Sequence, residues 1–90
     1  DAGTTVTGTV AIGSGALTAN TTADDNVAIG TNAASTNITG TAIVACGTQA
    51  LLNSTGTDNT AFGYRSGEGI TTGSQNTFLG SSAGLTNPTT

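Results

Sequence analysis

The sequence predicts an all-β fold: a parallel β-solenoid, of the β-roll or β-helix kind, with coils of 16–17 residues. The first observation is a four-residue phrase that occurs five times, at 10–13, 27–30, 44–47, 60–63 and 77–80. Its glycines lie 17, 17, 16 and 17 residues apart. The second is that no helical period is present, while Gly and β-branched residues recur too often for a stable helix. One such unit is too small to bury a core alone, so the 90 residues should form a single array.

About five coils are expected, each with two or three short strands joined at Gly and Asn corners. The repeat units lie near residues 4–13, 14–30, 31–47, 48–63 and 64–80, with a partial unit at 81–90. Adjacent coils should stack about 4.8 Å apart, which is the spacing of paired strands. Open ends of such an array would fit a filament of stacked subunits or a segment of a longer fibre.

The phrase itself reads as a strand whose first and third residues share one face. β-Branched and aromatic residues favour these two positions, and the final glycine permits a bend. The third position carries the larger apolar side chains, and we expect it to form the internal core column: Ile12, Ile29, Cys46, Phe62 and Leu79. In that column Cys46 would be a small buried hydrophobe, and the intervening alanines would face the other way.

Polar columns mark the corners of the coil. One contains Asn20, Asn37, Asn53 and Asn87, with Ile70 as the exception, if the one-residue deletion lies just before Asn53. Asn suits such a place because it tolerates left-handed backbone and bonds its own main chain. A second column is formed by Thr22, Thr39, Thr55, Thr72 and Thr89, with Thr7 extending it towards the N-terminus. The sequons that begin at Asn20, Asn37 and Asn53 arise from these columns, so they are interpreted as turn chemistry.

Charge and composition exclude several functions. Arg65 is the only cation against five acidic residues, and the net charge is −4, so nucleic-acid binding and a polybasic membrane site are not expected. No apolar run is long enough for membrane insertion. The chain has no His, which removes the usual catalytic base and the usual zinc ligand, and its lone Cys cannot form a thiolate cluster. We therefore expect no enzyme, no cofactor and no metal.

Two smaller clusters have alternative interpretations. Asp24, Asp25 and Asp58 could suggest a calcium site, but their equivalents in other coils are weaker ligands, so a solvated acidic corner is favoured. Arg65 and Glu68 lie in one bend and could pair. Tyr64 is either a contact point or a corner-packing residue.

The phrases at 26–30, 59–64 and 76–80, with the intervening Asn-x-Thr-Gly turns, resemble repeats of phage tail-fibre and related virion or surface proteins. Those proteins often end in an intramolecular chaperone domain of the endosialidase type. The element at 26–30 is also similar to head repeats of trimeric autotransporter adhesins, although those coils are shorter. The resemblance implies a structural fibre segment, extracellular or on a virion. It also implies self-association as a homotrimer or stacked filament, and cell-surface glycans as further partners.

The regular spacing of the threonines supports a different function, ice binding. Thr-x-Thr elements in register resemble the ice-binding face of β-solenoid antifreeze proteins. The candidate ligand or ice face consists of Thr7, Thr9, Thr22, Thr39, Thr41, Thr55, Thr57 and Thr72. Asp24 interrupts this face, and Thr-Gly is also an ordinary turn choice in fibre repeats. Ice binding is therefore the alternative to the fibre segment.

Overall fold

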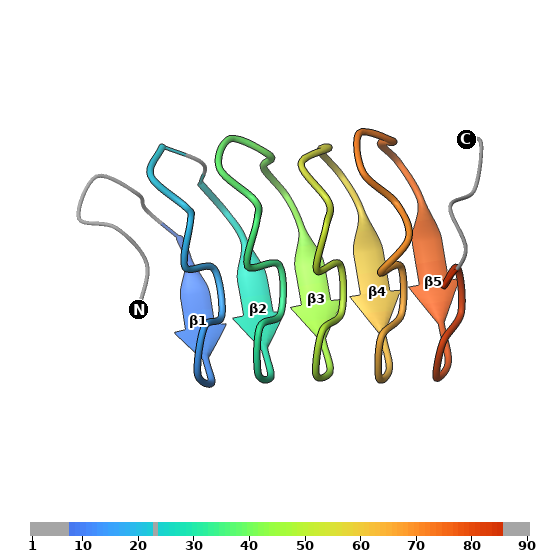
Figure 1. The fold of residues 1–90 in the computed structure, drawn as a ribbon. Helices are drawn as coiled ribbons and strands as arrows, with labels where there is room; N and C mark the ends of the chain where they lie inside the picture. Colours follow the sequence, from blue (N-terminus) through green and yellow to red (C-terminus); the bar gives the residue numbers. More distant parts are fainter. Residues whose placement is uncertain (1–7, 23, 86–90) are drawn as a thin grey trace.

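The structure, a computed structural model, describes residues 8–22 and 24–85. Over these residues the chain is an all-β solenoid without a helix, which confirms the predicted fold class. Each coil contributes one strand to a parallel sheet with the order β1-β2-β3-β4-β5. Figure 1 shows these strands side by side, with a loop that leads from each of β1 to β4 to the next strand. The strands are β1 (Val10–Ile12), β2 (Val27–Ile29), β3 (Val44–Cys46), β4 (Thr60–Phe62) and β5 (Thr77–Leu79).

We number the coils 1 to 5 by the strand that begins each of them. The recurring phrases stack in the register that their spacing predicts: Val10 pairs with Val27, Val27 with Val44, and Val44 with Thr60. Backbone hydrogen bonds between coils continue outside the sheet, as from Asn32 N to the Ser14 oxygen (2.8 Å). Equivalent residues therefore lie over one another around much of the coil.

The described part of each coil contains one assigned strand, where two or three were expected. The rest of the coil turns at residues with positive φ, and these recur at the same positions in successive coils. Leu17 and Leu51 both have φ 52°, and Asp25 and Asp58 have φ 60° and 62°. Left-handed residues interrupt extended backbone, so the long returning segment stacks on its neighbours without forming regular strands.

The sheet faces the core with its middle column. Ala28, Ala45 and Ala61 are fully buried, and Ala11 and Phe78 pack against the core in the terminal strands. The expected core column (Ile12, Ile29, Cys46, Phe62 and Leu79) does stack in register, but its facing was predicted wrongly. Ile12, Phe62 and Leu79 are 57%, 55% and 79% exposed, and Cys46 is half-buried rather than buried.

The far wall of the coil supplies the large core side chains, and this explains the inverted facing. The largest buried apolar residues are Leu17, Leu51, Ile43 and Ile70; Ile43 directly precedes β3, and the other three come from the returning segments. The strand opposite them has room only for alanine. In coil 5 the large side chain comes from the strand instead, because Phe78 takes the place of the alanine. Gly67 and Gly84 lie against its ring, and a methyl group on Gly84 would overlap the ring. Core volume is thus kept while its source changes.

Asparagine side chains are structural groups inside the corner rather than exposed turn residues. Asn37 is fully buried, and its amide donates to the Gly40 oxygen (2.9 Å) while its own oxygen accepts from Gly40 N (2.9 Å). Asn26 also donates to the Gly40 oxygen and accepts from Ile43 N, both at 2.9 Å. These bonds satisfy main-chain groups that the turn leaves without backbone partners.

The structure also corrects the alignment of the Asn column. The same main-chain turn bond, from a backbone N–H to the carbonyl oxygen three residues earlier, is made by Asn20, Asn37, Ser54 and Ile70. The third member is therefore Ser54, not Asn53, which is exposed. Gly40, Gly56 and Gly73 stack directly, so the deletion lies between Ser54 and Gly56. Asn87 and Thr89 lie outside the described residues.

Gly47→Ala should destabilise the fold far more than Gly80→Ala. Both glycines have positive φ (138° and 119°), but a methyl group at Gly47 would lie 2.6 Å from the Gly63 carbonyl carbon, whereas Gly80 has open space. Backbone strain alone should cost Gly80→Ala about 1–3 kcal/mol, and Gly47→Ala should lose more than about 4 kcal/mol. Chemical denaturation followed by circular dichroism measures both. Equal losses would show that the coils do not approach as closely at this glycine as described.

A second pair of variants tests which face of the sheet points into the core. Ala45→Asp places an unpaired carboxylate in the core, so it should cost at least about 3 kcal/mol or prevent folding. Cys46→Ser changes a half-buried neighbour and should cost within about 1 kcal/mol. Melting temperatures at low protein concentration measure both, and the reverse order would restore the inward facing of the Cys46 column.

Candidate functional site

The outer side of the parallel sheet is a candidate functional surface, which we call the sheet face. It consists of two columns: Val10, Val27, Val44, Thr60 and Thr77 in the first, and Ile12, Ile29, Cys46, Phe62 and Leu79 in the second. Neither column contains a charged residue. Several of the apolar side chains are more than half exposed, among them Phe62 (55%) and Leu79 (79%). A contiguous exposed apolar surface of this kind is typical of an interaction site.

The candidate threonine face is divided by the structure. Thr22, Thr39, Thr55 and Thr72 are exposed, one in each of four successive coils, and the stacked glycines that follow three of them keep these in register. Thr41 and Thr57 belong to a second column with Asp24 and Ser74, in which Asp24, Thr41 and Thr57 are half-buried and Ser74 is exposed. Thr9 belongs to neither column, because it precedes Val10 as Asn26 precedes Val27. Thr7 lies outside the described residues.

The hydroxyl groups of the second column join neighbouring coils. Thr41 N donates to Thr57 Oγ1 (3.3 Å), and Thr57 N donates to Ser74 Oγ (3.0 Å). In the exposed column, Thr55 Oγ1 donates to the Thr71 oxygen of the next coil (3.1 Å). These threonines therefore contribute to stacking, whatever else they bind.

The acidic residues do not converge. Asp25 and Asp58 occupy equivalent positions, but Ala42 takes that position in the coil between them. Across 8–22 and 24–85, no three His, Cys, Asp or Glu side chains gather where they could hold a metal ion. Asp25 and Asp58 are both exposed, which fits the interpretation as a solvated corner.

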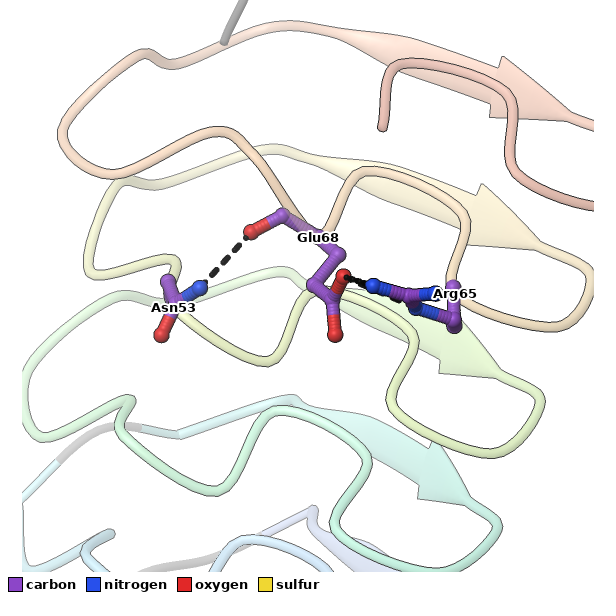
Figure 2. A network of polar contacts seen from close by, with 3 residues as sticks. All are labelled: Asn53, Arg65 and Glu68. Atoms are coloured by element: carbon purple, nitrogen blue, oxygen red, sulfur yellow. Dashed lines mark hydrogen bonds and ion pairs between the residues drawn. The ribbon is translucent and has the colours of Figure 1, made fainter. Parts of the chain in front are cut away.

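A polar cluster lies at the corner of coil 4, and Figure 2 shows its members. Arg65 Nη2 lies 2.7 Å from Glu68 Oε1, and Arg65 Nε donates to the same oxygen at 2.9 Å, which confirms the predicted pair. Asn53 Nδ2 of coil 3 donates to the Glu68 main-chain oxygen (3.0 Å). The hydrogen bond with Glu68 and its charge, with a smaller effect of Tyr64, raise the pKa of Arg65. Tyr64 itself is 53% exposed, which favours a contact point over a corner-packing role.

The three sequons differ in accessibility. Asn20 and Asn37 are buried, and the Asn37 amide is used to hold Gly40. Asn53 is exposed. Turn chemistry therefore explains Asn37, and Asn20 is buried at the equivalent position. A different role, the bond to coil 4, explains Asn53.

Sequence reasoning missed the sheet face as an exposed surface. Two signals could have found it. Ala11, Ala28, Ala45 and Ala61 form a nearly strict column, which indicates tight packing on that side. The first column changes from Val to Thr at Thr60 and Thr77, which an interior position would tolerate poorly.

No pocket opens in the described part of the chain, so any ligand would contact a surface rather than enter a cavity. The described residues form no helix, and so they contain no candidate for a helical membrane span. A scan against protein-family models found no match, and searches of curated proteins and of solved structures found no similar protein.

Thr57→Val should destabilise the solenoid by about 1–2 kcal/mol, because it removes the acceptor for Thr41 N. Thr39→Val makes the same chemical change at an exposed position and should stay within about 0.5 kcal/mol. Urea denaturation measures both free energies of unfolding. Equal values would mean that the second column does not hold the coils together.

Proposed function

We propose that this chain is a structural segment of a fibre or filament on an extracellular or virion surface, and that it is not an enzyme. The observation that carries the proposal is the sheet face, an uncharged and largely apolar strip that runs through all five strands. Exposing such an apolar strip to water is unfavourable for an isolated monomer, so the strip is expected to be covered by a partner.

The interior of the molecule supports a mechanical role. Backbone hydrogen bonds join coil to coil in the sheet and at the corners, as between Gly47 N and the Ile29 oxygen (2.7 Å) and between Leu51 N and the Ser66 oxygen (2.9 Å). Side-chain hydroxyls and amides add further bonds in the same direction. Bending the solenoid would stretch many of these bonds together, so a segment of this kind is suited to a stiff shaft.

The partner at the sheet face is proposed to be further copies of the same chain, as a homotrimer. The face repeats with the coil, so a second copy in parallel register offers a matching apolar row at every step. It carries no charge, so identical faces do not repel each other. Rotational symmetry brings the same patch of each copy to one axis and closes the assembly. End-to-end stacking of coils would extend such trimers into a filament.

Ile29→Asp should prevent this association while leaving the coil folded. Ile29 lies near the middle of the sheet face and is 37% exposed. An aspartate there would be desolvated and would face its own copies in the assembly. Sedimentation velocity should show a trimer for the wild-type chain and a monomer for the variant, with unchanged circular dichroism.

Ile38→Asp is the matched control, because Ile38 is also exposed (48%) but lies at a corner away from the sheet face. It should sediment as the wild-type chain does. Cys46 provides a second readout: a short bis-maleimide should link two copies, since equivalent residues meet in parallel register. A wild-type chain that stays monomeric at millimolar concentration, without this cross-link, would refute the homotrimer.

Ice binding is the second candidate, and one observation favours it. Thr22, Thr39, Thr55 and Thr72 are all exposed and follow one another from coil to coil. In the neighbouring column, however, Thr41 and Thr57 are half-buried, and the hydroxyls of Thr57 and Ser74 accept backbone hydrogen bonds, so a full double rank of free threonines is not offered. Thermal hysteresis in a purified sample that Thr39→Leu and Thr55→Leu abolish would favour this function over the fibre segment.

A further inference from the structure

Coil 4 departs from the repeat at one corner in a way that the fold does not require. Four coils carry Ser or Thr at the position after the strand glycine, namely Ser14, Thr31, Thr48 and Ser81, where coil 4 has Tyr64. The next position is Gly15, Asn32, Gln49 and Ser82 in the other coils and Arg65 in coil 4. Its φ is positive in all five coils, and the Arg65 value of 56° matches that of Asn32 (58°), so the backbone gives no reason for Arg.

The sequence thus concentrates its rarest chemistry in a few residues. Its only Arg, only Tyr and only Glu all lie between residues 64 and 68. Tyr64 contributes nothing to the core, because half of it is exposed. In a repeat protein, a group of such departures in one unit, here with Tyr64 exposed and the Arg65 side chain 38% exposed, indicates a site that has been added to the scaffold.

The cluster is held in place before any ligand arrives. Glu68 Oε1 contacts both Nε and Nη2 of Arg65, which fixes the plane of the guanidinium. Asn53 ties the Glu68 main chain to coil 3. Figure 2 shows the three side chains along one corner, with Asn53 and Arg65 on either side of Glu68. A binding group whose rotamers are already fixed loses less entropy when it binds.

We propose that this coil-4 corner (Asn53, Tyr64, Arg65 and Glu68) binds a neutral saccharide, with one sugar ring stacked on Tyr64 and its hydroxyls bonded to the planar polar groups beside it. An exposed aromatic ring presents a π-face to sugar C–H groups, while guanidinium, carboxylate and amide groups exchange hydrogen bonds with vicinal hydroxyls. The proposal rests on the proposed surface location only for its biological context.

The charge and shape of the coil-4 corner restrict the class of ligand further. The Arg65 cation is balanced by Glu68 at 2.7 Å, so the corner offers no net positive charge to a phosphate or a sialic acid. Because the described surface has no pocket, the ligand should touch few residues and bind with millimolar affinity. Repetition of the corner in an oligomer would raise the overall affinity without new contacts.

The test is an NMR titration of the ¹⁵N-labelled chain with cellotetraose, maltotetraose and triacetylchitotriose, and with 3′-sialyllactose as the charged probe. At least one neutral sugar should shift the amide signals of residues 64–69 and 53, and sialyllactose should bind no better. Because Tyr64 is the only tyrosine and Trp is absent, its ring signals and fluorescence also report on the site.

Tyr64→Ser and Arg65→Gln introduce residues that other coils carry at the same positions, so both variants should fold. Each should weaken the binding about tenfold or more. Ile38→Ser is the matched control: it removes an exposed apolar side chain at another corner, away from both the sheet face and the coil-4 corner, and should leave sugar binding unchanged.

Several outcomes would overturn the proposal. These are no shift with any neutral sugar, shifts confined to the threonine columns, or a Tyr64→Ser variant that binds sugar normally. A change in oligomeric state caused by Tyr64→Ser would assign the corner to a protein contact instead. Sedimentation of the wild-type chain separates these results from failure of the fibre proposal, which does not depend on the coil-4 corner.

Discussion

Hydrogen bonding between the backbones of successive coils is the constraint on which the rest of the structure depends. It places each residue over its equivalent one coil away, so whatever fits at one level must fit at every level. The strand glycines show the result, because their φ values lie between 119° and 140° and side-chain atoms at Gly30, Gly47 or Gly63 would meet the next carbonyl group. The buried amides of Asn26 and Asn59 show it as well, since each bonds to the main chain of a neighbouring coil.

This constraint explains how much the sequence could predict. A repeat that must stack leaves its period in the sequence, so the parallel solenoid, the five strands and their register followed from the spacing of the phrases. The spacing did not predict which side of each strand faces the core, because the alternation of side chains along a strand shows only that Ala45 and Cys46 lie on opposite sides. The size of the side chains suggested that the larger residues were internal. The width of the coil is set instead by Leu17, Leu51 and Ile70 in the returning segments, and no local pattern reveals that.

Parts of the candidate sites depended on details of alignment that residue types cannot give. Asn53 appeared to continue the column of Asn37, yet the turn bonds place Ser54 there and leave Asn53 to contact Glu68. Thr9 looked like a member of a Thr-Gly-Thr element but lies at the entrance to a strand. The Arg65–Glu68 pair was predictable, because two opposite charges three residues apart in one tight bend have few other partners. The uncharged sheet face could not be predicted without knowing that the alanine column is internal.

The shortened corner of coil 3 has a consequence for how such a molecule can change. One residue is missing between Ser54 and Gly56, yet the strands on both sides keep their register, and Ser54 still bonds inward to Asn59. Length at this bend is therefore independent of the stacking that fixes the remainder of the loop. New peptide could be inserted there, at one level or at several, and carried on the outside of an otherwise unaltered rod.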